Sequence, residues 1–175
     1  MKHLMLLRHA KAVPATPGIS DRDRPLADRG HRDARLMGKA IVEAGAPDLI
    51  LVSPAKRTRE TLSDILASVP PSTRVVVVPE IYGASGTYLD IVARHGGDAA
   101  RLLVIGHNPT IHATAVASAA TGDRKRREAL AEKFPTGSLV VSRFAIDDWA
   151  DIGDSRGELI AFIRPRDLGA TDATD

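Results

Sequence analysis

The stretch LMLLRHAKAVPA, residues 4–15, places two strongly polar side chains directly after four apolar ones. An unbroken apolar run such as Leu4–Leu7 is typical of a strand that is covered on both faces. Arg8 and His9 follow at the tip of that strand, where a guanidinium and an imidazole add nothing to packing. The stretch therefore predicts a buried strand that carries a cation and a titratable ring to one edge of a sheet.

Three more apolar runs of the same kind recur along the chain, at Leu49–Val52, Val75–Val78 and Leu102–Ile105. Strands that alternate with helices predict an α/β fold with a parallel sheet. Helical spacing, with apolar residues three or four apart, is found between and after these runs, within residues 34–44, 62–69, 87–95 and 110–120.

After Gly122 the rhythm changes. Residues 124–133 suit either a short polar helix or an excursion from the sheet. Ser138–Ile146 and Glu158–Arg164 have the character of two strands joined by an acidic turn region. We expect them to add an antiparallel hairpin to one edge of the sheet.

Length and composition bound the remaining possibilities. The chain has 175 residues, which suits a single domain over residues 1–167, with residues 168–175 as a disordered tail. It has no cysteine, which excludes a disulfide scaffold and a thiolate nucleophile. The net charge of +2 is too small to favour a nucleic-acid partner, and no apolar run approaches the roughly 20 residues that span a membrane. We expect a cytoplasmic protein that binds neither nucleic acid nor membrane.

Each of the other predicted strands also ends beside a charged or titratable residue. The second is followed by SPAKRTRET, in which Ser53 is expected to cap a helix, so that Arg57 lies near a helix N-terminus. Glu80 follows the third strand. The fourth is followed by GHNPT, in which Asn108 repeats the cap and His107 takes the last loop position. Each residue alone has an ordinary structural explanation, but their recurrence at four successive strand tips favours a functional site.

The carboxyl ends of parallel strands lie along one edge of the sheet, where open α/β sheets bind ligands. We therefore expect one pocket to collect the side chains that follow the four strands, Arg8, His9, Arg57, Glu80 and His107. Arginine presents a fork of donors that matches phosphate oxygens, and helix N-termini favour anions. This combination indicates a phosphate group as the ligand.

These residues resemble the motifs of the histidine phosphatase superfamily, also called the phosphoglycerate mutase-like or RHG family. LRHAKA, SPAKRTRET and GHNP carry the resemblance, and RPLADRGHRDA (residues 24–34) is similar to the family's segment before its first helix. The motifs occur in the family's order and spacing over residues 2–112. The compact length and the RHAKA form are most similar to the SixA-type protein phosphohistidine phosphatases. The resemblance implies a three-layer α/β/α sandwich with a mostly parallel central sheet and a C-terminal antiparallel addition.

The resemblance also implies a role for each matched residue. His9 corresponds to the nucleophile that becomes phosphorylated. Arg8, Arg57 and His107 correspond to the groups that hold the phosphoryl oxygens, and Glu80 falls where many members keep a general acid. The family's chemistry uses no metal and no cofactor.

One residue departs from the family motif, because Ala10 stands where the motif has glycine. Ala10 is expected to take an ordinary negative φ. For His9, we expect a backbone carbonyl to accept a hydrogen bond from one ring nitrogen, which leaves the other nitrogen free to attack phosphorus. The charges of Arg8 and Arg57 oppose protonation of the ring.

The substrate expected from the resemblance is phosphohistidine on a protein, whose imidazole leaves more easily than an alkoxide. A small phosphomonoester is the alternative substrate, and a phosphate-binding or phosphohistidine-binding module without turnover is the alternative function. A zinc hydrolase is a further rival, since His9 and His107 could ligate a metal. However, Glu80 is the only well-placed carboxylate, and two arginines would repel a cation.

The charged loop SDRDRP, residues 20–25, is expected to be solvated and locally paired.

Overall fold

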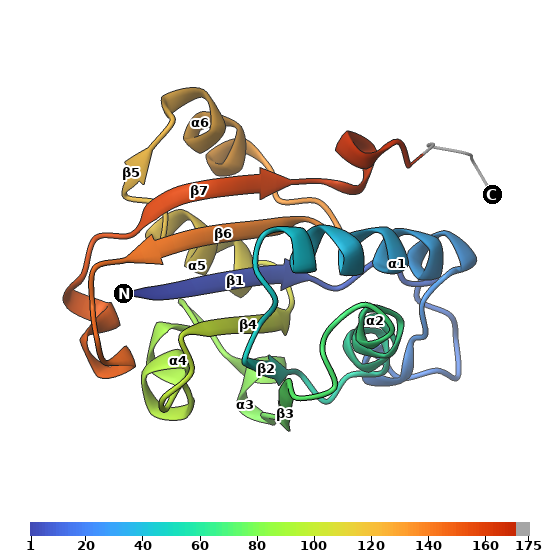
Figure 1. The fold of residues 1–175 in the computed structure, drawn as a ribbon. Coiled ribbons are helices and arrows are strands. Elements are labelled where there is room, and N and C mark those ends of the chain that lie inside the picture. Colours follow the sequence, from blue (N-terminus) through green and yellow to red (C-terminus); the bar gives the residue numbers. More distant parts are fainter. Residues whose placement is uncertain (171–175) are drawn as a thin grey trace.

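The computed structural model of the protein describes residues 1–170. Its centre is a seven-stranded mixed sheet in the order β3-β2-β4-β1-β6-β7-β5 (Figure 1). The strands are β1 (Lys2–Arg8), β2 (Leu49–Val52), β3 (Arg74–Val77), β4 (Arg101–Gly106), β5 (Thr121–Gly122), β6 (Leu139–Phe144) and β7 (Glu158–Ile163). The helices are α1 (Asp28–Glu43), α2 (Lys56–Leu66), α3 (Glu80–Gly83), α4 (Leu89–His95), α5 (Thr110–Ala117) and α6 (Arg124–Glu132), with 3-10 turns η1 (Asp21–Asp23), η2 (Trp149–Asp154) and η3 (Pro165–Leu168).

β1 lies near the middle of the sheet and is buried on both faces, as its apolar run predicts. Successive side chains of a strand point to opposite faces. Leu4 and Leu6 join the apolar cluster formed with α4, α5 and α6, whereas Met5 and Leu7 join the cluster formed with α1 and α2. All four side chains are fully buried. The expected α/β/α layering is therefore confirmed.

Four strands are parallel, because β1 pairs with β4, β4 with β2, and β2 with β3 in that sense. β4 lies between β1 and β2, so the connection from β1 to β2 skips one strand position, which β4 later occupies. The helices that follow β1 and β2 pack on one face of the sheet, and those that follow β3 and β4 pack on the other. In open α/β sheets, ligands bind at the point where the strand order reverses in this way, beside the carboxyl ends of the strands.

The expected C-terminal hairpin is also confirmed, since β6 is antiparallel to β1 and β7 is antiparallel to β6. The open choice for residues 124–133 is settled by α6. A two-residue strand that the sequence pattern did not predict, β5, pairs with β7 at the outer edge.

Two expectations about local structure are wrong. β3 is not covered on both faces: Val75, Val76 and Val77 are 40–49% exposed, because β3 is the edge strand. The predicted helix caps are also wrong. α2 begins after Ala55 and α5 begins after Pro109, so Ser53 and Asn108 lie in the preceding loops.

The end of the chain was expected to form a tail. Leu168 instead ends η3, and Gly169 follows it as the helix C-cap. The last part of the expected tail, residues 171–175, lies outside the described residues. Within residues 1–170, no helix has both the length and the apolar character needed to cross a membrane.

Candidate active site

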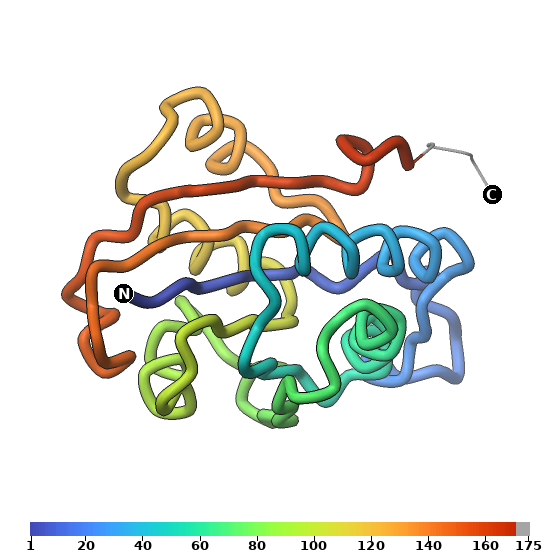
Figure 2. Tube along the Cα trace, in the orientation of Figure 1, coloured from blue at the N-terminus to red at the C-terminus, as the bar shows by residue number. Residues whose placement is uncertain are grey.

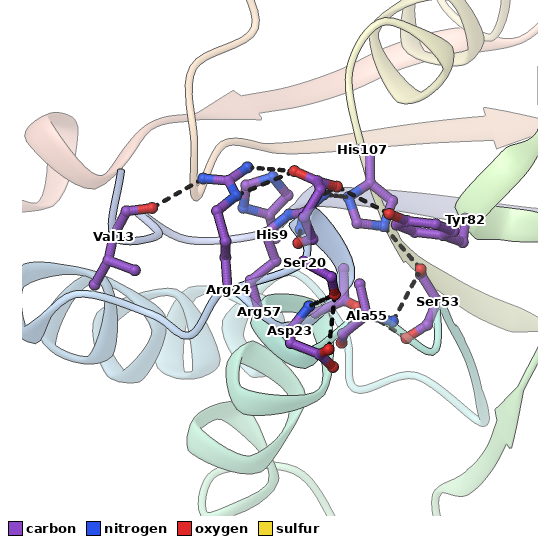
Figure 3. A network of polar contacts seen from close by, with 12 residues as sticks. His9, Val13, Ser20, Asp23, Arg24, Ser53, Ala55, Arg57, Tyr82 and His107 are labelled. Carbon is purple, nitrogen blue, oxygen red and sulfur yellow. Dashed lines mark hydrogen bonds and ion pairs between the residues drawn. The ribbon is translucent and has the colours of Figure 1, made fainter. Parts of the chain in front are cut away.

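His9 and His107 follow two neighbouring strands and meet at the carboxyl edge of the sheet. Arg8 of β1 lies opposite Gly106 of β4, and the backbone N–H of His9 donates to the Gly106 carbonyl at 3.1 Å. The two imidazole rings are 5.3 Å apart, centroid to centroid. Figure 3 shows both rings gathered with Arg57, Tyr82 and Ser53. The meeting of His9 and His107 that the strand-tip pattern predicted is therefore present in the structure.

The backbone around Ala10 fixes the tautomer of His9. Nδ1 of His9 lies 2.8 Å from the Ala10 carbonyl oxygen, which can only accept, so Nδ1 carries the proton. The N–H of Ala10 in turn donates to Oγ1 of Thr61 at 3.1 Å. No non-glycine residue in the described chain has a positive φ, so Ala10 has the ordinary backbone expected of it. Nε2 of His9 is left as the unprotonated, nucleophilic nitrogen.

His107 is held through both of its ring nitrogens. Nη2 of Arg57 lies 3.2 Å from Nδ1, and Oγ of Ser53 lies 2.7 Å from Nε2. A guanidinium can only donate, so Nδ1 of His107 accepts and Nε2 carries the proton that goes to Ser53. Ser53, expected as a helix cap, is thus a partner of the second histidine.

Both imidazoles are neutral. Burial lowers the pKa of His9 to about 3; the hydrogen bond to Ala10 opposes this shift, and electrostatic repulsion from His107, Arg57 and Arg8 adds to it. Burial and the charge of Arg57 lower the pKa of His107 to about 4. An unprotonated ring is the form that can act as a nucleophile.

Arg8 lies beside this pair. Its Nη1 donates to the carbonyl of Phe134 at 3.0 Å, and the amide of Asn108 donates to the same oxygen at 3.2 Å. Nε of Arg8 and Nε of Arg57 are both buried and have no hydrogen-bond partner among the described residues. A buried donor without a partner costs free energy, which an anion in the pocket would offset.

The pocket around these residues has a volume of about 400 Å³. Ten of the side chains that the structure describes line it, four of which are cations and one a carboxylate: Arg8, His9, Lys11, Ala12, Asp21, Arg24, Arg57, His107, Asn108 and Thr136. The cationic lining suits a phosphoryl group. Within residues 1–170, no group of three or more histidine, cysteine, aspartate or glutamate side chains is arranged to hold a metal ion.

Glu80, the fifth residue of the expected site, is not brought to this pocket. It begins α3, its side chain is half exposed, and its Oε1 lies 3.6 Å from Nη1 of Arg94. It lines a separate surface hollow with Pro79 and Arg94. The strand-tip pattern correctly placed Glu80 near the carboxyl edge of the sheet, but the first turn of α3 carries it away from the histidines.

Asp21 occupies the pocket instead, and the sequence pattern missed it. The expected local pairing of its loop is present, since Arg24 donates to Oδ1 of Asp21 through Nε and Nη2 at 3.1 and 2.9 Å. However, Oδ2 of Asp21 also accepts hydrogen bonds from Arg57 at 3.1 Å and from the hydroxyl of Tyr82 at 2.9 Å. The loop is solvated and locally paired as expected, but the contacts of Asp21 with Arg57 and Tyr82 were not predicted. Figure 2 shows this loop, between β1 and α1, running beside α2.

The charge of Asp21 follows from these contacts. Partial burial raises the pKa of this carboxyl, but the hydrogen bonds from Arg24, Tyr82 and Arg57 outweigh it and lower the pKa to about 2. Burial and Asp21 itself raise the pKa of Tyr82, so its hydroxyl stays protonated and donates. Asp21 is therefore an anion at neutral pH.

Comparison with known proteins identifies the fold family. The model of the histidine phosphatase superfamily (branch 1) matches residues 4–81. The structure of a SixA protein from Agrobacterium tumefaciens, whose own phosphohistidine phosphatase activity is inferred, is 33% identical with a TM-score of 0.77; the match covers 94% of this chain and 97% of that one. The chain belongs to the histidine phosphatase superfamily.

The matches to relatives cover nearly the whole length of this histidine phosphatase. A SixA structure from Nakamurella multipartitia, with an activity inferred in the same way, is 31% identical with a TM-score of 0.80, covering 94% of this chain and 96% of that one. An uncharacterised protein from Mycobacterium tuberculosis is 39% identical over 164 residues, which are 91% of this chain and 100% of that protein. The family model includes Arg8, His9 and Arg57 but ends before β4, so it leaves out His107.

Proposed function

We propose that this histidine phosphatase is a metal-independent enzyme that works through a phosphohistidine intermediate on His9, and that its substrate is phosphohistidine on a protein. The observation that carries the proposal is the tautomer of His9. Its Nδ1–H is fixed on the Ala10 carbonyl, which leaves Nε2 unprotonated inside a pocket lined by cations. A protein that only binds phosphate has no need of such a nitrogen.

In the first step, Nε2 of His9 attacks phosphorus in line with the leaving group. The Nε2–P bond forms, the bond from phosphorus to the leaving atom breaks, and its electron pair stays with the leaving atom. The guanidinium groups of Arg8 and Arg57 stabilise the charge on the phosphoryl oxygens in the transition state. The dianion favours protonation of a neighbouring imidazole, so His107 takes a proton from solvent on Nδ1 once Arg57 has turned to the phosphoryl group. The Nδ1–H then donates a hydrogen bond to a phosphoryl oxygen.

In the second step, water attacks the phosphorus of phospho-His9. The O–P bond forms, the Nε2–P bond breaks with its electron pair returning to the ring, and the protons of the water stay on the product, which leaves as dihydrogen phosphate. The ring of this intermediate carries phosphorus on Nε2 and a proton on Nδ1, so it is cationic. A cationic ring departs as neutral imidazole, which makes it a good leaving group. The hydrogen bond to Ala10 thus serves both steps, because it makes Nε2 a nucleophile first and a leaving atom afterwards.

Two observations favour phosphohistidine over a phosphomonoester as the substrate. Among the described residues that line the pocket, the one carboxyl is that of Asp21, which is anionic and cannot donate a proton to an alkoxide. Imidazole departs without that help, since its conjugate acid has a pKa of about 6.5. The solved SixA relatives, which are named for inferred phosphohistidine phosphatase activity, support the same substrate.

The test is to trap the intermediate. The protein is mixed with a radiolabelled phosphohistidine protein, and the reaction is stopped in alkali. We expect an acid-labile, base-stable phosphate on His9, and neither label nor turnover in His9→Ala. His31→Ala serves as the control, because His31 pairs with Asp64 outside the pocket. Turnover without a label on His9, or normal turnover by His9→Ala, would exclude this mechanism. A panel of small phosphomonoesters run in parallel tests the alternative substrate class.

A further inference from the structure

Asp21 places a fixed negative charge inside a pocket that is otherwise built to receive one. The remaining charged side chains among the residues lining it are cations, Arg8, Lys11, Arg24 and Arg57. A carboxylate at this position repels a phosphate dianion, so its presence needs an explanation.

The hydrogen bonds of Asp21 use all of its acceptor positions. Oδ1 accepts both bonds from Arg24, and Oδ2 accepts one from Tyr82 and one from Arg57. Two donors for each oxygen match its two lone pairs. Arg24 is itself anchored to the Val13 carbonyl at 2.9 Å, and the cap of η1 is formed by Ser20. The carboxylate is therefore held by the loop even without Arg57.

Arg57 is the group that Asp21 shares with a phosphoryl ligand. Its Nη1 donates to the backbone carbonyl of Asp21 at 2.7 Å, and its Nη2 donates to Oδ2 of Asp21 and to Nδ1 of His107. The same Nη2 cannot also serve a phosphoryl oxygen. When Arg57 turns to the phosphoryl group, Oδ2 keeps the hydroxyl of Tyr82 and gains one free acceptor position.

Asp21 lies at the outer part of the pocket. His9 is only 7% exposed and lies at the floor, whereas the side chain of Asp21 is 57% exposed and lies at the mouth. In-line attack puts the leaving group on the side of phosphorus opposite to His9. The leaving group therefore lies on the open side of the pocket, where Asp21 is found.

We propose that Asp21 is a specificity-determining residue. It loses its hydrogen bond from Arg57 when Arg57 binds the phosphoryl group, and it then accepts a hydrogen bond from the protonated imidazole of a phosphohistidine substrate. This inference rests on the function proposed above and extends it from the phosphoryl group to the leaving group. An alkoxide or phenolate has no N–H to donate, and its developing negative charge is repelled by the same carboxylate.

The bonds balance without any further reactant. The substrate imidazole carries phosphorus on one nitrogen and a proton on the other, so the ring is cationic. As Nε2 of His9 bonds to phosphorus, the P–N bond of the substrate breaks and its electron pair returns to the ring. The ring leaves as neutral imidazole, with its N–H still donating to Oδ2 of Asp21. Asp21 favours the cationic, reactive form of the substrate ring, so it raises kcat/KM for P–N cleavage, and it does nothing for P–O cleavage.

The experiment compares Asp21→Asn with the matched variant Asp23→Asn. Asp23 belongs to the same 3-10 turn, but its carboxylate binds Ser20 and is not part of the pocket. Turnover is measured on phosphohistidine and on p-nitrophenyl phosphate. We expect the ratio of kcat/KM on phosphohistidine to kcat/KM on p-nitrophenyl phosphate to fall by about tenfold or more in Asp21→Asn. The ratio should stay unchanged in Asp23→Asn. Asp21→Glu, which keeps the charge, is expected to keep most of the ratio.

Binding of inorganic phosphate gives a second readout that needs no turnover. Removing a competitor for Arg57 and a like charge should tighten phosphate binding by about fivefold in Asp21→Asn, as measured by calorimetry. An unchanged substrate ratio together with a normal label on His9 overturns the role of Asp21 and leaves the proposed function standing. If wild-type protein takes no label on His9, the proposed function fails and the leaving-group role fails with it.

Discussion

Oγ of Ser53 lies 2.7 Å from Nε2 of His107, and this hydrogen bond ties the loop after β2 to the loop after β4. Both side chains are buried. The bond fixes which nitrogen of His107 faces the pocket, because Nε2 is committed to Ser53 and only Nδ1 remains for Arg57 or a ligand.

Ser53→Ala should therefore reduce activity without removing any group that touches the phosphoryl. It leaves the N–H of a buried imidazole without a partner, which costs about 1–3 kcal/mol. We expect kcat/KM to fall by roughly tenfold, which corresponds to about 1.4 kcal/mol of lost transition-state stabilisation when His107 is less well positioned. Ser63→Ala, at an exposed position of α2, is the control. Equal activity of the two variants would show that His107 is positioned without Ser53.

The pKa values of the two histidines predict how stability varies with pH. Both are about 6.5 in the unfolded chain and are lowered in the folded protein, to about 3 for His9 and about 4 for His107. Between these values the unfolded state binds more protons, so the free energy of unfolding rises with pH up to about 6.5 and is lost as pH falls. Each group contributes a slope of up to about 1.4 kcal/mol per pH unit.

Urea unfolding between about pH 5 and 6.5 checks this slope, since most carboxylates are already ionised there. His9→Gln should lower the slope by up to about 1.4 kcal/mol per pH unit. A variant that keeps the full slope would mean that His9 titrates normally in the folded protein. The same pKa predicts that imidazole NMR signals of wild-type His9 do not titrate between about pH 5 and 8.

Ala10→Gly tests the departure from the family motif. Ala10 is fully buried in a small cluster with Leu26 and Ala34, and its φ is negative. Glycine would lose the buried methyl group and gain freedom in the unfolded chain, which together cost about 1–2 kcal/mol. The Ala10 carbonyl still accepts from His9, so turnover should stay within about threefold of wild type. A gain in turnover above tenfold would show that the methyl group distorts the pocket.

Glu80→Gln tests whether the half-exposed carboxylate takes part in the reaction. Its contact with Arg94 is a surface ion pair, of a kind worth about 0–1 kcal/mol. We expect less than a threefold change in kcat/KM on either phosphohistidine or p-nitrophenyl phosphate. A selective loss on p-nitrophenyl phosphate would instead make Glu80 the acid that protonates an oxygen leaving group.

The residues predicted from the sequence were those whose position depends on strand order alone. Arg8, His9 and His107 follow buried parallel strands, and a run of apolar residues is enough to locate such strands. Arg57 was also within reach, because the loop between β2 and α2 is short.

The residues missed were those placed by irregular backbone. Asp21 reaches the pocket from a loop between β1 and α1, and its contact with Arg57 spans 36 positions with no periodic pattern to reveal it. Ser53 was given the wrong partner, because serine before proline is a helix-start signal whose local energy is about 1 kcal/mol, and a buried hydrogen bond to His107 overrides it.

The position of β4 also bears on synthesis of the protein. Residues 101–106 fill the space between β1 and β2, so a nascent chain that has exposed only β1, β2 and β3 has an open slot at the centre of its sheet. In that chain the backbone N–H of His9 lacks its Gly106 partner and the second imidazole has not yet been made. Under the proposed function, a chain that ends before His107 lacks part of the phosphoryl site, so we expect a ribosome-stalled product of about the first hundred residues to be inactive even if it has collapsed.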